Sequence, residues 1–168
     1  GSYIRVFAAD FDGDGIAELT APNKGAQSPG PEDYARSTPV EMYQLAGDPL
    51  SGSSWQRSEL GSYSIPQNAE PVDLAGDGDM DIVVGARGDA RLVYFENLGA
   101  GSLDFEEHAI GIYGGNLAGF NLEYTDLSGD GRLDIIGMSS GGQFKWIEQP
   151  ENSDDTWNAY TIGSILPD

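Results

Sequence analysis

The chain has 168 residues, enough for one domain with a buried core, and 39% of them are hydrophobic, which argues against disorder. Its 28 acidic and 8 basic side chains give a net charge of −20, which repels phosphate backbones and anionic membrane surfaces and so disfavours nucleic-acid binding. There is no cysteine, so disulfides and thiol catalysis are excluded, and the 24 glycines and 9 prolines indicate many turns and short strands.

A first repeat unit is predicted over residues 3–62. A short strand leads into an acidic loop, 10–18, which reads D-x-D-x-D-G-x-x-E and is followed by an apolar strand. Further along, an alternating aromatic strand around residues 42–44 precedes a strand over 55–60 that opens with a tryptophan. Four short strands separated by turns are typical of one blade of a β-propeller.

The first unit also carries an insertion. The stretch from Leu19 to Tyr43 has 25 residues, whereas the matching stretches of the later units have 14 and 13. Its core, 27–36, is rich in Pro and Gly and should lie on one rim of the propeller. Tyr34 and Arg36 are candidate ligand-binding residues there, because long rim loops with an aromatic and an arginine often bind ligands. The alternative is a tolerated surface insertion.

A second unit is predicted over residues 68–113 in the same order. Its acidic loop spans 73–81, its aromatic strand ends in Tyr94-Phe95-Glu96-Asn97, and its fourth strand runs over 105–110. Ala75 replaces the acid at the third loop position and cannot act as a metal ligand. The second loop is therefore expected to bind metal more weakly than the others.

A third unit is predicted over residues 119–165. Its loop spans 126–134, its aromatic strand ends in Trp146-Ile147-Glu148-Gln149, and its fourth strand runs over 157–162. The first aspartates of the three loops are 63 and 53 residues apart, and the aromatic openers of the fourth strands are 50 and 52 apart. Two landmarks with a common period indicate a repeat.

The predicted fold is therefore all-β: three four-stranded antiparallel blades over residues 1–168, part of a six- or seven-bladed ring. A single irregular antiparallel sandwich is the alternative. Three blades do not ordinarily close a ring, so the faces of the terminal blades should be covered by further blades, by a second chain or by self-association.

The repeated acidic loops predict calcium sites, because Ca²⁺ prefers six to eight hard oxygen ligands and a tight loop presents alternate side chains inward. The predicted ligands are Asp10, Asp12, Asp14, Ile16 and Glu18 in the first loop, Asp73, Asp77, Asp79 and Asp81 in the second, and Asp126, Ser128, Asp130, Arg132 and Asp134 in the third. Ile16 and Arg132 would use their carbonyls, and Asp79 its carbonyl or its carboxylate. Carboxylate count ranks the first loop tightest and the second weakest, so two or three sites are expected.

The loops admit two other interpretations. An EF-hand is disfavoured, because the glutamate expected at the twelfth position is replaced by Ala21, Val84 and Gly137, and strands rather than helices flank the loops. An Asx-rich turn that satisfies its own backbone remains the structural alternative for any single loop.

These motifs resemble the FG-GAP/VCBS repeat family, whose blades occur in integrin α-subunit heads, fungal propeller lectins and secreted carbohydrate-active proteins. The resemblance rests on residues 10–15, residues 126–134 and the two strand ends 94–97 and 146–149. It implies a secreted or extracellular protein, often a seven-bladed ring, in which calcium is structural rather than catalytic.

The rest of the sequence offers little catalytic chemistry. His108 is the only histidine and is predicted to face solvent on the fourth strand of the second unit, with a general base as the alternative role. Trp146, Tyr94, Trp55 and Trp157 could stack on sugars, but their repeat-equivalent positions favour packing between blades. Paired carboxylates for glycoside cleavage remain open among 28 acids.

The favoured function is a calcium-stabilised extracellular propeller module that binds carbohydrate or a protein partner without catalysis. One alternative is the propeller portion of a larger carbohydrate-active enzyme, such as a lyase or dehydratase. Another is a purely structural scaffold.

Overall fold

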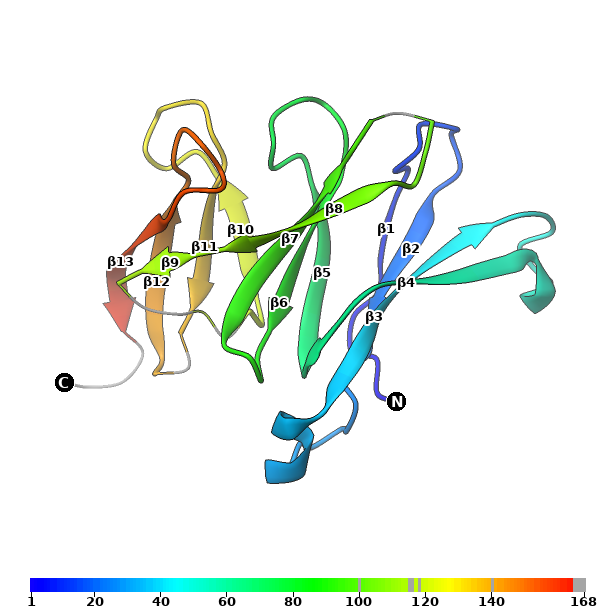
Figure 1. Ribbon diagram of the computed structural model, residues 1–168, viewed down its shortest axis with the longest axis horizontal. Helices are drawn as coiled ribbons and strands as arrows, with labels where there is room; N and C mark the ends of the chain where they lie inside the picture. Colours follow the sequence, from blue (N-terminus) through cyan, green and yellow to red (C-terminus); the bar gives the residue numbers. More distant parts are fainter. Residues whose placement is uncertain (100, 115–116, 118, 140, 165–168) are drawn as a thin grey trace.

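Three small β-sheets form the computed structural model of the chain (Figure 1). The structure describes residues 1–99, 101–114, 117, 119–139 and 141–164. Within these residues the all-β prediction is confirmed, since the helical elements are two short 3-10 turns, η1 (Pro31–Ala35) and η2 (Gly52–Ser54). None of the helices in this part of the chain has the length and apolar character that crossing a membrane requires.

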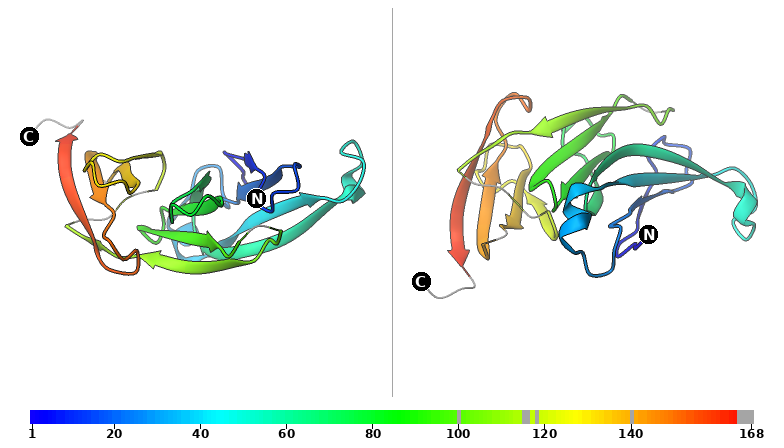
Figure 2. Two further views of the ribbon diagram at one scale, coloured as in Figure 1. Left: turned by 90° about the horizontal axis from the view of Figure 1, so that it is seen from above. Right: turned by 60° about the horizontal axis from the view of Figure 1, so that its bottom comes forward.

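The sheets follow one another along the sequence, and in each of them four consecutive strands form an antiparallel meander. The first contains β1 (Phe7–Ala9), β2 (Glu18–Pro22), β3 (Ser37–Leu45) and β4 (Trp55–Ser64). The second contains β5 (Pro66–Val72), β6 (Asp81–Ala86), β7 (Arg91–Asn97) and β8 (Phe105–Ile110). The third contains β10 (Leu122–Thr125), β11 (Asp134–Met138), β12 (Gln143–Glu148) and β13 (Trp157–Ser164), with β9 (Ile112–Tyr113) as a fifth strand. Figure 2 shows the three sheets side by side along an arc.

The fifth strand is a departure from the four expected in each unit. β9 lies at the end of the stretch predicted as the second unit, yet it pairs in parallel with β13 of the third sheet. The N–H of Trp157 also donates to the carbonyl of Gly111, 2.7 Å away. The connecting segment thus covers the start of the outer edge of β13, at Trp157 and Asn158, where an unpaired strand would expose its N–H and C=O groups.

The same register repeats in each sheet. The residue after the last loop acid pairs with a large apolar residue of the third strand: Leu19 with Tyr43, Ile82 with Phe95, and Ile135 with Ile147. Every residue of β6 is buried, because this strand lies between the first and third sheets. A strand covered on both faces needs a continuous apolar run, and the sequence Ile-Val-Val supplies it.

Two apolar clusters join the sheets. Ile82 and Val84 face the first sheet and pack with Val40 and Met42, whereas Val83 faces the third sheet. This alternation follows from the two-residue period of a strand. Tyr94 and Trp157 are fully buried in the second cluster, as expected for aromatics that pack between blades. Trp55 and Trp146 differ from this expectation, because Trp55 lines an open hollow and Trp146 stacks on Tyr160 within the third sheet.

Candidate metal site

The three acidic loops lie along one edge of the fold, at the top of Figure 1, where each joins the first two strands of its sheet. The last acid of each loop begins the following strand: Glu18 begins β2, Asp81 begins β6 and Asp134 begins β11. The relative exposure is 1% for Glu18 and 0% for the two aspartates. A buried carboxylate is costly unless N–H donors or a cation compensate it, so each of these side chains requires partners.

In the second and third loops the partners are backbone N–H groups. Asp81 accepts hydrogen bonds from the N–H groups of Leu74 and Ala75 at 2.8 and 2.9 Å and from that of Asn97 at 2.9 Å. Burial raises the pKa of Asp81, and these N–H groups oppose the rise. Asp134 repeats the pattern with the N–H groups of Leu127, Ser128 and Gln149 at 3.0, 3.1 and 3.0 Å.

The first aspartate of each of these two loops also accepts hydrogen bonds from backbone N–H groups. Asp73 accepts from the N–H groups of Gly76, Asp77 and Gly78 at 2.8, 3.1 and 3.1 Å. Asp126 accepts from those of Gly129, Asp130 and Gly131 at 2.6, 3.1 and 2.8 Å. These N–H donors hold the pKa of Asp126 below its ordinary value, and that of Gly131 has the largest effect. Positive φ angles of 75° at Gly76 and 99° at Gly78 allow the turn.

The first loop is arranged differently. Asp10 accepts a hydrogen bond from the N–H of Gly15 at 2.8 Å through Oδ2, while the N–H of Asp14 donates to Asp12 Oδ1 at 3.2 Å. Asp10, Asp12 and Glu18 each offer one carboxylate oxygen within 4.8 Å of the other two. Among the described residues this triad is the group of acids that could hold a metal ion.

The donor set of the triad fits a hard divalent cation, because all three ligands are carboxylate oxygens. Glu18 also accepts from the N–H of Phe11 at 3.0 Å, through Oε2. Burial, together with the charges of Asp12 and Asp14, raises the pKa of Glu18 despite this N–H. A nearby cation would offset the same cost of burying the charge.

The other predicted ligands of the first loop lie outside the triad. Asp14 uses Oδ1 to accept from the N–H of Ile16 at 2.7 Å. The Ile16 side chain is exposed. The assignment of Asp14 and of the Ile16 carbonyl as ligands stays a prediction.

The remaining loop residues mostly make local contacts. Asp77 accepts from the N–H of Asp79 at 3.0 Å, and Ser128 donates to Asp126 at 3.4 Å. Arg132 forms an ion pair with Asp130 and donates through Nε to the carbonyl of Gln149 at 3.2 Å. The described structure thus brings an acidic triad together in the first loop. In the second and third loops the first aspartate instead accepts hydrogen bonds from backbone N–H groups of its own turn.

The insertion of the first unit forms η1 and the connection into β3. Arg36 pairs with Asp33 at 3.0 Å, and Asp33 accepts from the N–H of Gly30 at 2.8 Å. The Tyr34 side chain is exposed, and its carbonyl accepts from the hydroxyl of Ser64 at 3.0 Å. Ligand binding by Tyr34 and Arg36 stays a prediction.

The prediction that His108 faces solvent requires correction. Its ring stacks on Tyr94 with centroids 4.8 Å apart, and only 18% of the side chain is exposed. Nδ1 lies 3.0 Å from Asp154 and Nε2 lies 3.1 Å from Glu96. His108 pairs with Tyr94 across β7 and β8 and lies on the same face of the strand as Ile110, which packs toward the third sheet, and Asp154 in the loop before β13 covers it.

Sequence reasoning missed a polar cluster on the outer face of the first sheet. Glu41 is buried and accepts hydrogen bonds from Tyr3 at 2.6 Å, from Tyr43 at 2.9 Å and from Arg57 Nε at 2.7 Å. A charged residue between the apolar residues Val40 and Met42 was the available signal.

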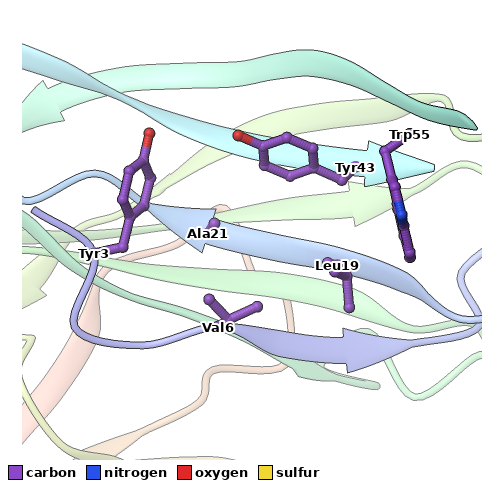
Figure 3. A pocket seen from close by; sticks show the side chains of 6 residues that line it. All are labelled: Tyr3, Val6, Leu19, Ala21, Tyr43 and Trp55. Carbon is purple, nitrogen blue, oxygen red and sulfur yellow. The ribbon is translucent and has the colours of Figure 1, made fainter. Parts of the chain in front are cut away.

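Beside Glu41 lies an open apolar hollow of about 520 Å³ (Figure 3). The residues that line it are Tyr3, Val6, Leu19, Ala21, Tyr43 and Trp55. The two tyrosine hydroxyls donate to Glu41, so the aromatic rings present mainly carbon to the hollow.

Comparison with known protein families finds a match for part of the chain. Residues 73–137, from the first aspartate of the second loop into β11, match the model of the FG-GAP-like repeat. The chain therefore carries an FG-GAP-like repeat, as the motifs indicated, and such repeats often bind Ca²⁺. The comparison with curated proteins found no match.

Proposed function

We propose that this chain, which carries an FG-GAP-like repeat, is a calcium-stabilised β-propeller module that works outside the cytoplasm and binds a partner without catalysis. The observation that supports it most directly is the triad Asp10, Asp12 and Glu18, with one oxygen from each within 4.8 Å of the others. Extracellular calcium is abundant enough to fill even modest sites, which carboxylate loops of this kind provide.

The role of the metal in this proposal is structural. When bound, Ca²⁺ supplies two positive charges to three carboxylates that otherwise repel one another. Glu18 is fixed at the start of β2, and its neighbour Leu19 pairs with Tyr43, so the triad is tied to the sheet. Binding that favours the folded chain over the unfolded one raises stability by mass action.

We also propose that the hollow of the first sheet is a contact surface for another blade. Leu19, Ala21 and Tyr43 occupy the positions that Ile82, Val84 and Phe95 occupy in the second sheet. Those three residues of the second sheet pack against the first sheet. A protein surface suits the hollow better than a sugar, because the hydroxyls of its tyrosines are directed to Glu41 and a sugar needs polar partners. The blade could come from the same protein or from a second copy.

Thermal unfolding with calcium and with excess chelator tests the metal proposal. We expect chelation to lower the melting temperature and calcium to restore it in the wild-type chain. Asp10→Asn should reduce this response, whereas Asp155→Asn, which removes an exposed charge outside the acidic loops, should keep it. A melting temperature that does not change in excess chelator would contradict the proposal.

Sedimentation of the chain at several concentrations tests the contact surface. We expect self-association, or binding of a dye for apolar surface, that Val6→Glu abolishes. Leu50→Glu is the matched control, because this leucine is exposed and lies outside the hollow. A monomer that binds no such dye would overturn this part of the proposal.

A further inference from the structure

A side-chain amide links each pair of neighbouring sheets at the acidic edge. Asn97, the last residue of β7, donates through Nδ2 to the carbonyl of Phe11 in the first loop at 2.8 Å. Gln149, just after β12, donates through Nε2 to the carbonyl of Leu74 in the second loop at 3.2 Å. Phe11 and Leu74 both follow the first aspartate of their loops, so the link is the same in both places.

Both amides are buried, and each is also tied to its own loop. Asn97 is 2% exposed and Gln149 is 5% exposed. The backbone N–H of Asn97 donates to Asp81, and its Nδ2 also lies 3.2 Å from the carbonyl of Met80. Asn97 therefore contacts two acidic loops at once.

The first loop depends on the second sheet for its shape. Phe11 lies between the candidate ligands Asp10 and Asp12 in the chain, and its ring packs edge-on against Phe105 with centroids 5.8 Å apart. Its N–H donates to Glu18, and its carbonyl accepts from Asn97. The next carbonyl, that of Asp12, accepts from the N–H of Gly101 at 2.8 Å.

We propose that Asn97 is a positioning residue for the metal site of the neighbouring sheet: its amide holds the Phe11 carbonyl and so sets the spacing of Asp10, Asp12 and Glu18. This inference rests on the proposed calcium binding at the first loop. Groups that orient metal ligands from outside the coordination sphere commonly change metal affinity ten- to a hundredfold when they are removed. The position equivalent to Asn97 in the first sheet is Leu45, which carries no amide.

Calcium titration calorimetry on the full chain and three variants tests the proposal. Asn97→Leu, which mimics Leu45, should weaken the tightest calcium-binding event about tenfold. Asn97→Gln restores an amide of the kind that Gln149 supplies in the third sheet and should bind within about threefold of wild type. Gln149→Leu removes the same type of bond from the second loop and should leave the tightest event unchanged.

A second measurement does not depend on the folding of any variant. In the isotope-labelled wild-type chain, the side-chain amide resonance of Asn97 should shift in step with the tightest calcium event, whereas that of Gln149 should not. If Glu18→Gln abolishes that event but Asn97→Leu binds as wild type and the Asn97 resonance stays fixed, the positioning role is wrong while the calcium site stands. If the wild-type chain binds no calcium, both proposals are overturned.

Discussion

Asp81 and Asn97 are joined across two neighbouring strands: the N–H of Asn97 at the end of β7 donates to Oδ1 of Asp81 at the start of β6, 2.9 Å away. The other oxygen of this carboxylate accepts from the N–H groups of Leu74 and Ala75. One buried side chain therefore closes the second loop and fastens it to the next strand. Asp134 does the same in the third sheet.

The first prediction concerns this buried carboxylate. Asp81→Asn places an NH₂ group where three N–H donors require acceptors, so we expect the free energy of unfolding to fall by about 2 to 4 kcal/mol. Glu106→Gln on β8 makes the same change of charge on an exposed side chain and should alter stability by less than about 0.5 kcal/mol. Denaturant unfolding measures both, and equal effects of the two changes would contradict the role of Asp81.

The second prediction concerns Tyr3 on the outer face of the first sheet. The hydrogen bond to Glu41, together with burial and the charge of Glu41, raises the pKa of Tyr3 to about 12. The protonated phenol is the form that donates, so this contribution to stability is complete below the ordinary tyrosine pKa of about 10 and is lost as the pH rises through about 12. Glu41→Gln should return the Tyr3 titration toward its ordinary range.

Ultraviolet titration of the phenolates, with the Tyr3→Phe difference identifying this group, gives the measurement. Glu59→Gln is the control, because Glu59 is exposed on β4. If Tyr3 titrates at the same pH with and without Glu41, the hydrogen bond does not set its pKa.

The third prediction concerns pH and the first loop. Burial first, and then the charges of Asp12 and Asp14, raise the pKa of Glu18, so this side chain takes up a proton above the ordinary range of a glutamate. Without metal, the pKa of Glu18 is higher in the folded chain than in the unfolded chain. The contribution of Glu18 to stability therefore increases as the pH falls through the pKa of the folded chain. Calcium requires the ionised form, so calcium affinity should fall over the same pH range, with proton release on binding.

Calorimetry at a series of pH values, in buffers of different ionisation enthalpy, measures both quantities. Glu18→Gln has no proton to lose at this position and should show weaker binding with less pH dependence. A calcium affinity that stays constant as the pH falls toward the ordinary pKa of a glutamate would contradict the raised pKa.

The sequence allowed the sheets and loops to be predicted because their signals are local. The continuous apolar run from Ile82 to Val84 indicated a strand, and the repeated D-x-x-G-D-G spacing located the turns. The contacts between sheets carry no such signal. Nothing in the sequence around Asn97 shows that its amide bonds to Phe11, 86 residues away, or that Asp154 covers His108.

The difference between the loops was equally hard to predict from spacing. Glu18, Asp81 and Asp134 hold the same loop position, but glutamate is one methylene longer than aspartate. In the second and third loops the first aspartate accepts from three backbone N–H groups, whereas in the first loop Asp10 accepts from the N–H of Gly15 and is itself part of the triad. Carboxylate count ranked the first loop highest, and the geometry of the described residues gives a physical reason for that rank.

Direct titration of the metal-free chain with calcium, by calorimetry, tests the central claim that the first loop is the principal metal site. We expect one tightest event in the wild-type chain that Glu18→Gln abolishes and that Asp77→Asn, an equal loss of charge in the second loop, leaves in place. A tightest event that survives Glu18→Gln and disappears with Asp77→Asn would assign the site to the second loop and contradict the account.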